Sequence, residues 1–196
     1  MRKIIYAMSV SLDGFIEAAD GDFSWLYPDE ELHRFFNSQE ARIDVYLYGR
    51  NMYENMAAYW PVADKNPKAP MVEIEYARIW KEKPKIVFSK TLKEVSWNSR
   101  LCSGEIEKEV KKLKEQKEGT MSVSGAALAR ALMNHNLIDE YWLYVHPIIV
   151  GSGKPMFGEL KNKIKLRLQE THTFTSGVVL LKYRGMHYER FGDPSL

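Results

Sequence analysis

The chain has 196 residues, 45% hydrophobic and 28% charged, so it is long enough to bury a hydrophobic core. Lys and Arg total 28 and Asp and Glu total 26. The resulting net charge of +2 excludes the strongly basic composition of general nucleic-acid or membrane-surface binders. The single cysteine, Cys102, cannot form an intrachain disulfide, which predicts a cytoplasmic protein. Because no repeat or separating linker is visible, we expect residues 1–196 to form one domain.

The first half of the chain alternates between predicted strands and helices. Residues 4–10 form a short apolar run typical of a buried strand, and Asp13-Gly14 marks the turn after it. A helix is predicted to begin at residues 28–31, because proline and carboxylates favour a first helical turn and apolar residues follow at helical spacing. The other elements expected here are a strand over 43–48, a short helix over 51–58, a helix over 71–83 and a strand over 85–89.

The second half continues this alternation and ends in β structure. Ser103 is a candidate N-cap for a helix that reaches Glu118. A strand over 120–124, a helix after Gly125 and a strand over 138–146 follow, and then a glycine loop over 151–153. The stretches 164–174 and 178–188 read as two strands joined by a hairpin turn at Ser176-Gly177. This order predicts an α/β fold with a mixed, mainly parallel sheet, helices on both faces and a C-terminal antiparallel hairpin.

Three strand-to-helix turns are candidate binding sites, because ligands in such folds lie at the carboxyl ends of the strands. The first turn contains Gly49 and Arg50, where a helix start and a guanidinium suit a phosphate. The second contains Ser89 and Lys90, and the third is the small-residue run 124–128. Each also has a plain structural interpretation, as a tight turn, a polar loop or close helix–sheet packing.

Several short motifs occur in an order that resembles the dihydrofolate-reductase-like superfamily. The resemblance is greatest to the branch related to the C-terminal reductase domain of the bacterial riboflavin-biosynthesis deaminase–reductase, and it covers roughly residues 4–188. The motifs lie at 11–16, 25–26, 49–54, 87–92, 137–140 and 147–157. The resemblance implies the three-layer fold of that superfamily and an NADPH-dependent reductase, often a homodimer. The implied substrate is a small pterin- or pyrimidine-like heterocycle or a ribosylaminopyrimidine, as for 5-amino-6-(5-phosphoribosylamino)uracil reductase and dihydrofolate reductase.

The resemblance also implies which residues bind the cofactor. Positions that look like the grip on the adenosine 2′-phosphate are Arg50, Ser89 and Lys90. Positions that look like the pyrophosphate cradle are Gly49, Asn51, Met52, Ser124, Gly125, Ala126, Ala127 and Leu128. Ser9 and Ile16 fall where the nicotinamide ring would lie. The chain departs from the family pattern in two places, with alanines in place of a paired glycine after Gly125 and with Glu17 where a small residue is usual.

On the substrate side, the resemblance points to Asp13, Trp25 and Glu31. Hydride transfer to a heteroaromatic ring needs a proton donor, often a carboxyl group in an apolar pocket. Glu31 is the nearest match to that carboxyl group and Asp29 is the alternative, although carboxylates in a first helical turn are also favoured by the helix dipole. Asp13 is either a polar contact to the substrate or a turn residue. The five histidines show no metal-ligand spacing.

Two other functions remain open at this point. The protein could be a nucleotide-binding module without catalysis, which the Ala126-Ala127 departure and the uncertain acid favour, or a protein that sequesters aromatic metabolites. The expected partners are a small-molecule substrate and a second copy of the chain, and neither nucleic acid nor membrane. The aromatic residues Tyr141, Trp142 and Tyr144, together with 178–183, would suit a dimer surface.

Overall fold

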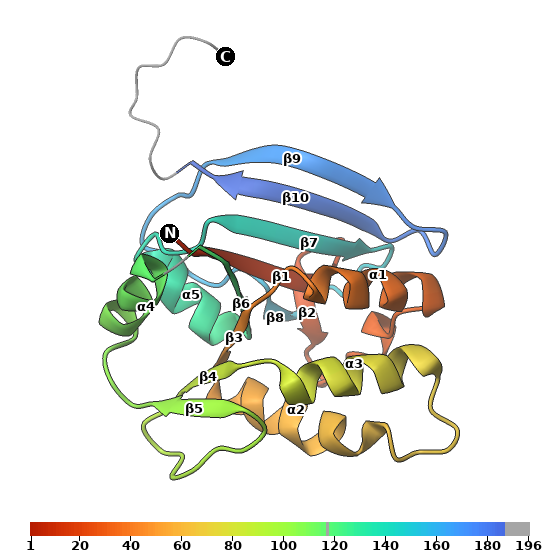
Figure 1. The fold of residues 1–196 in the computed structure, drawn as a ribbon. Coiled ribbons are helices and arrows are strands. Elements are labelled where there is room, and N and C mark those ends of the chain that lie inside the picture. The colour runs from red at the N-terminus through yellow and green to blue at the C-terminus, as the bar shows by residue number, and fades with distance from the viewer. Residues whose placement is uncertain (117, 187–196) are drawn as a thin grey trace.

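The computed structural model describes residues 1–116 and 118–186 (Figure 1). The strands are β1 (Lys3–Ser11), β2 (Phe15–Ala18), β3 (Val45–Gly49), β4 (Lys85–Phe88), β5 (Ser99–Cys102), β6 (Thr120–Ser124), β7 (Glu140–His146), β8 (Gly153–Pro155), β9 (Leu166–Thr173) and β10 (Val179–Gly185). The helices are the 3₁₀ turn η1 (Ser24–Leu26) and α1 (Glu30–Glu40), α2 (Arg50–Ala63), α3 (Met71–Glu82), α4 (Ile106–Glu115) and α5 (Ala126–Asn134).

Eight strands form one sheet in the order β5-β4-β3-β6-β1-β7-β10-β9, and β2 pairs with β8 in a small second sheet. The pairings from β5 across to β7 are parallel, whereas β10 is antiparallel to both β7 and β9. The predicted α/β fold with a mainly parallel sheet and a C-terminal antiparallel hairpin is therefore confirmed. Because the parallel strands run in one direction, their carboxyl ends lie along one edge of the sheet.

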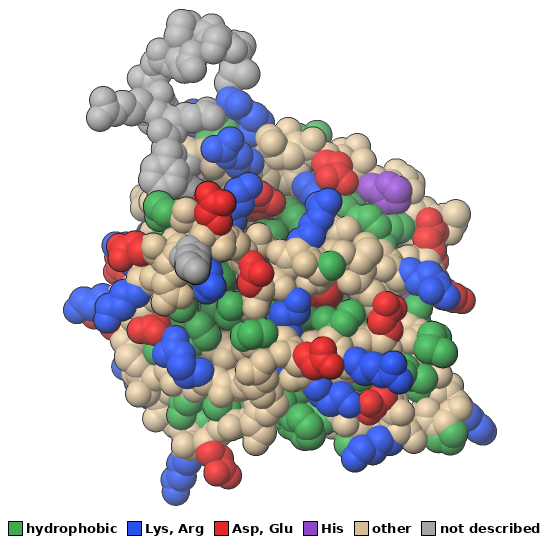
Figure 2. All heavy atoms as spheres, viewed as in Figure 1, with side chains coloured by type: hydrophobic (Ala, Val, Ile, Leu, Met, Phe, Trp, Pro, Cys, Tyr) green, Lys and Arg blue, Asp and Glu red, His purple; other side chains and the backbone are tan. Residues whose placement is uncertain are grey.

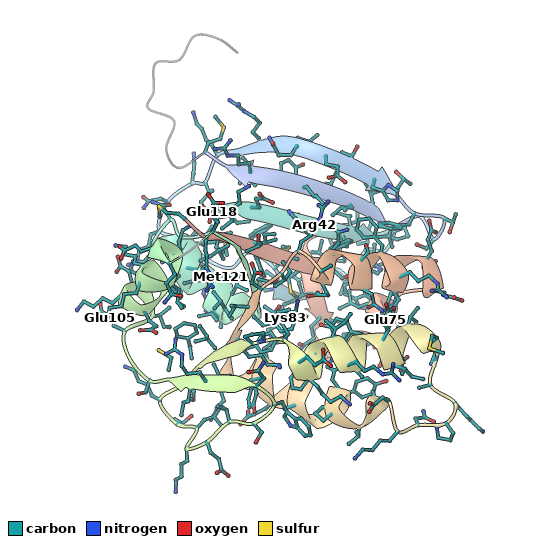
Figure 3. All side chains as sticks on the ribbon, viewed as in Figure 1. Arg42, Glu75, Lys83, Glu105, Glu118 and Met121 are labelled. Carbon is teal, nitrogen blue, oxygen red and sulfur yellow. The ribbon has the colours of Figure 1, made fainter. Side chains whose placement is uncertain are left out.

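Helices lie on both sides of this sheet (Figure 1), and a hydrophobic cluster fills the space between each helix layer and the sheet. The first joins one sheet face to α4 and α5, and it includes Leu47, Val110 and Leu132. The second joins the other face to α1, α2 and α3, and it includes Leu32 and Trp80. Burying each large apolar side chain stabilises the fold by roughly 1.5–3 kcal/mol. In Figure 3, Met121 of β6 lies inside the molecule, whereas Glu105 lies at the outer end of α4.

The start of α1 agrees with the prediction, whereas both ends of α4 differ from it. The Asp29 carboxylate accepts the Leu32 backbone N–H at 2.8 Å and caps α1, which begins at Glu30, within the stretch 28–31 where the helix start was predicted. The expected N-cap of α4 at Ser103 is wrong, because the helix begins at Ile106 with Glu105 at the cap position. It also ends at Glu115 rather than Glu118, so that the chain can turn into β6. Gly119 makes that turn with a φ of +151°, where an added Cβ would lie 2.5 Å from the Asp44 carboxylate.

Several β elements differ from expectation. The turn at Ser176-Gly177 is part of a longer loop between β9 and β10, in which Phe174 and Val178 are buried and their backbones are hydrogen-bonded at 2.9 Å. The strands β2, β5 and β8 are short and carry weak patterns, and the sequence did not predict them. The helix α2 runs to Ala63, past the expected end at 58. Tyr188, the expected end of the last strand, lies outside the described residues.

The charge distribution and the burial of aromatic residues bear on which partners the protein can bind. On the face drawn in Figure 2, positive and negative side chains are interspersed, as expected for a chain with a net charge of +2. Tyr141, Trp142 and Tyr144, the aromatic residues expected on a dimer surface, are each at most 5% exposed, so they pack inside the chain. Of the other residues expected there, Val178 and Leu180 are buried and Val179, Leu181 and Tyr183 are half-buried, and the homodimer stays a prediction. No helix within the described residues is long and apolar enough to cross a membrane.

Candidate cofactor and substrate site

The carboxyl ends of five neighbouring strands form a continuous rim. Gly49 of β3 is in register with Phe88 of β4, and Tyr48 of β3 with Ser124 of β6. Farther along, Ser11 at the end of β1 is in register with His146 at the end of β7. Since neighbouring strands lie about 4.8 Å apart, the three steps from β4 to β1 span roughly 14 Å. The three predicted strand-to-helix turns therefore lie side by side on one rim.

Two helices begin together at the centre of this rim. Their N-cap residues, Gly49 before α2 and Gly125 before α5, have no side chain that could accept the first helical N–H groups. A Cβ at Gly49 would lie 3.8 Å from the Leu128 Cβ, and one at Gly125 would lie 3.4 Å from the Met52 Cβ. The two N-termini are thus in van der Waals contact, and their N–H groups and dipoles favour a shared anion.

The departure at Ala126-Ala127 matters less than the sequence indicates. The position that requires glycine is Gly125, whose φ of +97° lies in a region that L-residues rarely adopt. Ala126 is half-buried and packs against the first hydrophobic cluster, so its methyl group faces the interior. Ala127 is exposed on the first turn of α5.

Arg50 extends the rim toward the loop after β4. Its Nη1 donates to the Thr91 hydroxyl at 3.2 Å, and its Nε lies 3.9 Å from the Glu54 carboxylate, with 49% of the side chain exposed. The Ser89 hydroxyl accepts two backbone N–H groups of the same loop and holds its shape. Lys90 is exposed beside it. The hydroxyl of Thr91, the last residue of the predicted turn 88–91, is therefore one of three groups that hold the guanidinium, with the Asn51 side-chain oxygen at 3.4 Å and the Glu54 carboxylate.

The residues expected at the nicotinamide end lie on different elements. Ser9 is half-buried on β1, in register with Tyr144, and strand alternation directs it to the face of the second hydrophobic cluster. Ile16 of β2 is buried in the first hydrophobic cluster. Glu17, beside it, lies 3.5 Å from the Lys154 ammonium of β8, so its carboxylate is drawn into the small sheet. The structure therefore does not bring Ser9 and Ile16 onto one face.

Asp13 anchors the turn after β1. Its carboxylate accepts the Ser11 hydroxyl at 2.7 Å and the backbone N–H groups of Val150 and Gly151 at 3.1 and 2.7 Å. These hydrogen bonds, chiefly the one from Ser11, lower the pKa of Asp13 to about 2. The group is ionised at neutral pH and ties the turn to the glycine loop, so the geometry does not support a role as proton donor.

Glu31 also serves as an anchor. Its carboxylate accepts both the hydroxyl and the backbone N–H of Thr175, which joins the start of α1 to the loop between β9 and β10. The same hydrogen bonds, the hydroxyl first, lower the pKa of Glu31. The alternative carboxyl group, Asp29, is engaged as the cap of α1. The geometry therefore does not support either residue as a ready proton donor.

Trp25 lies in η1 and contacts a residue that the sequence did not single out as functional. Its ring is perpendicular to that of His146, at an angle of 78° and a centroid separation of 5.9 Å. His146 is the last residue of β7, so Trp25 covers the β1–β7 end of the rim. His146 was not predicted as a site residue because it ends a mostly apolar strand. Its position at the carboxyl end of that strand is the one sequence feature that could have indicated a role in binding.

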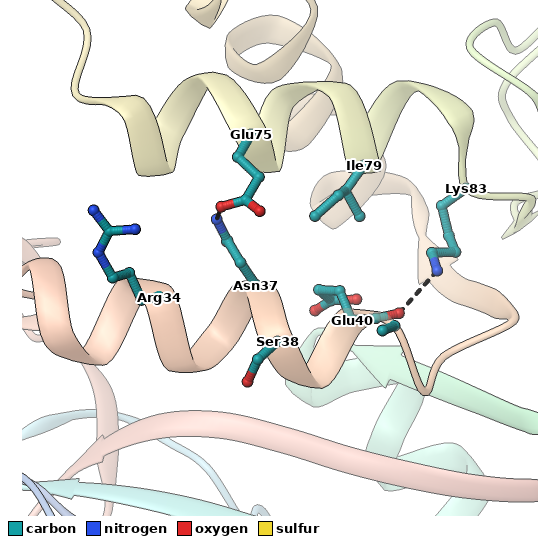
Figure 4. A pocket seen from close by; sticks show the side chains of 8 residues that line it. Arg34, Asn37, Ser38, Glu40, Glu75, Ile79 and Lys83 are labelled. Carbon is teal, nitrogen blue, oxygen red and sulfur yellow. Dashed lines mark hydrogen bonds between the residues drawn. The ribbon is translucent and has the colours of Figure 1, made fainter.

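A separate groove of about 440 Å³ lies between α1 and α3 (Figure 4). It is lined by side chains that include Asn37, Glu75 and Lys83. Because Lys83 lies two residues before the start of β4, the groove lies at the opposite edge of the sheet from the rim. Among the described residues, no group of three or more His, Cys, Asp or Glu side chains is placed to hold a metal ion.

Comparison with known proteins decides the family. A family model described as the RibD C-terminal domain matches residues 2–180. The chain belongs to the RibD C-terminal domain family. The uncharacterized protein YyaP of Bacillus subtilis (strain 168) is 37% identical over 183 residues, which cover 93% of this chain and 94% of YyaP.

Solved structures extend the likeness of this RibD C-terminal domain protein to its fold. A putative riboflavin biosynthesis protein from Shewanella sp. PV-4 has a TM-score of 0.74 and 22% identity, covering 94% of this chain and 99% of that one. Dihydrofolate reductase from Enterococcus faecalis, solved in complex with NADP(H), has a TM-score of 0.60 and 12% identity, covering 94% and 96%. The predicted dihydrofolate-reductase-like fold and its riboflavin-reductase branch are thus confirmed.

Proposed function

We propose that this protein is an NADPH-dependent reductase of a small pterin- or pyrimidine-like heterocycle or a ribosylaminopyrimidine. Membership of a family of reductase domains supports an oxidoreductase. The observation that carries the choice of cofactor is the convergence of the two glycine-capped helix starts at Gly49 and Gly125, with the Arg50 guanidinium beside them. This arrangement suits an elongated anion with a phosphate at one end.

The rim residues have distinct roles in this proposal. Arg50, Ser89, Lys90 and Thr91 would hold the 2′-phosphate, and the N–H groups after Gly49 and Gly125 would hold the pyrophosphate. The nicotinamide end would then be held near the end of β1, in the neighbourhood of Ser9. Bound NADPH supplies the hydride, and the substrate lies at the β1–β7 end beside Trp25.

Direct titration tests the proposal. NADPH and NADH are added to the pure protein while tryptophan fluorescence and the melting temperature are followed. We expect NADPH to bind in the micromolar range and to raise the melting temperature, because a ligand that binds only the folded state stabilises it. An absence of any change at millimolar NADPH would refute the proposal. Oxidation of NADPH is then followed at 340 nm with a panel of pterins, pyrimidines and ribosylaminopyrimidines.

A nucleotide-binding module without catalysis is the second candidate. The observation that favours it is the engagement of both candidate proton donors, since the Glu31 carboxylate accepts hydrogen bonds from Thr175 and the Asp29 carboxylate caps α1. Tight NADPH binding with no oxidation across the panel would support this candidate over the reductase.

A further inference from the structure

The groove between α1 and α3 continues past the ends of both helices. A second hollow, of about 370 Å³, adjoins it and shares Ala41, Ile79 and Lys83 with its lining. The middle of α1 contacts the middle of α3 through Asn37, and the end of α1 contacts the end of α3 through Lys83, so the two helices run in the same direction. The two hollows form one trough, the α1–α3 trough, which follows the seam between these helices to their C-terminal ends.

The α1–α3 trough has an excess of negative charge. Its charged lining residues are the four acids Glu40, Asp44, Glu75 and Glu82 and the two bases Arg34 and Lys83. Both helices end here, and a helix C-terminus carries about half a negative elementary charge. Both bases are already engaged. Arg34 pairs with Glu30 at 2.5 Å, and the Lys83 ammonium donates to two backbone carbonyls at 2.9 and 2.5 Å. The charge that is left to balance is therefore negative.

An acceptor without a partner lies in the wall of this trough. Asn37 is 6% exposed and is one of the lining residues, so a cavity opens onto its side chain. Its Nδ2 donates to the Val72 carbonyl at 2.9 Å and to the Glu75 carboxylate at 2.8 Å, which fixes the orientation of the amide (Figure 4). Among the described residues, Asn37 Oδ1 has no hydrogen-bond partner. Because folded proteins leave few buried acceptors unsatisfied, this atom calls for an N–H or O–H donor.

The spacing of the acids suits an extended ligand. Glu75 and Glu82 are seven residues apart on α3, so they lie on the same side of the helix about 10 Å apart. Ile79 lies between them and lines both hollows. Both acids are exposed, and neither pairs with a basic side chain in the described part of the chain. The trough thus presents an acid, an apolar side chain and a second acid in a row.

We propose that the α1–α3 trough binds a linear aliphatic polyamine. One terminal ammonium binds the Glu75 carboxylate and donates to Asn37 Oδ1, the other binds Glu82, and the methylene chain between them packs on Ile79. A metal ion fits less well, because within residues 1–116 and 118–186 no three acidic, histidine or cysteine side chains converge on one point. The trough lies at the opposite edge of the sheet from the rim, so the proposal does not depend on the proposed function.

The test is calorimetric titration of the full chain with spermidine and with the shorter diamine putrescine. An ionic strength of about 0.15 M screens diffuse attraction between charges. The wild type should bind spermidine at least tenfold more tightly, because putrescine cannot reach both acids. Glu82→Gln should weaken spermidine about fivefold, the loss expected for one exposed ion pair, and leave putrescine within twofold. Glu75→Gln should weaken both amines about fivefold, and its side-chain oxygen can still accept from Asn37, which preserves the packing of the helices.

Glu105→Gln is the matched control, because it removes the same charge from an exposed residue at the outer end of α4 (Figure 3). It should bind both amines as the wild type does. Losses in this control as large as those in Glu75→Gln and Glu82→Gln would show general charge attraction and overturn the proposal. Equal affinity of the wild type for the two amines, or no binding of spermidine at millimolar concentration, would overturn it as well. Tighter binding of inorganic phosphate than of spermidine would do the same, since the trough would then act through Arg34 and Lys83.

Discussion

Replacing Arg50 with alanine should separate the two nicotinamide cofactors. The guanidinium is positioned by the Thr91 hydroxyl at 3.2 Å and lies beside the two helix starts, where a 2′-phosphate would complete its hydrogen bonds. NADH carries a hydroxyl group in place of that phosphate. The substitution therefore removes a charge-assisted contact from NADPH alone.

The expected size follows from the exposure of the side chain. A hydrogen bond to a charged partner contributes about 1.5–3 kcal/mol. Because 49% of the Arg50 side chain is exposed and Glu54 lies 3.9 Å away, solvent and this carboxylate weaken the contact, and we expect the lower end of that range. A loss of about 1.5 kcal/mol raises the Kd for NADPH roughly tenfold. The Kd for NADH should change by less than twofold.

The assay is quenching of tryptophan fluorescence by each cofactor at fixed ionic strength. Thr91→Val should weaken NADPH by about two- to fivefold, because it removes only the hydroxyl that orients the guanidinium. Arg34→Ala is the control, since Arg34 pairs with Glu30 on α1 and is 60% exposed. The difference between NADPH and NADH should shrink in 1 M salt. Equal losses for both cofactors in Arg50→Ala would refute the placement of the 2′-phosphate.

Three further predictions concern stability. Gly125→Ala forces a φ of +97° on a residue with a Cβ. We therefore expect the free energy of unfolding in urea to fall by about 1–2 kcal/mol and both cofactors to bind more weakly. An unchanged urea midpoint would contradict this strain. The lowered pKa of Asp13 contributes stability that is present above pH 4 and is lost as the pH falls toward 2. The deficit of Asp13→Asn in urea unfolding should therefore shrink over that range, and a constant deficit would count against it. Asp139→Ala leaves the buried Lys114 ammonium, 4% exposed, without its carboxylate, and we expect the free energy of unfolding to fall by about 3 kcal/mol. Lys108→Ala removes one partner of an exposed ion pair and should lower it by less than about 1 kcal/mol. Similar losses in the two variants would refute the distinction between buried and exposed pairs.

Much of the fold could be predicted from local sequence. Alternating apolar runs and turn residues indicate the parallel strands, and the cap at Asp29 follows from short-range chemistry. The strands β2, β5 and β8 escaped prediction because they have at most four residues and depend on partners distant in sequence. Ser103 has the side chain of a typical N-cap, but the chain enters α4 two residues later, so Glu105 stands at the cap position of that helix.

The sequence by itself determined the α/β class, the glycines that begin α2 and α5, and the candidate cations on the rim. Those features depend on backbone geometry and residue chemistry, which neighbours in the chain specify. Only the tertiary structure decided what the side chains do. It engaged Asp13 and Glu31 in hydrogen bonds with residues more than 130 positions away, placed Thr91 against Arg50, and buried His146 beside Trp25. Such contacts form only when the sheet brings distant segments together, so no local pattern could encode them.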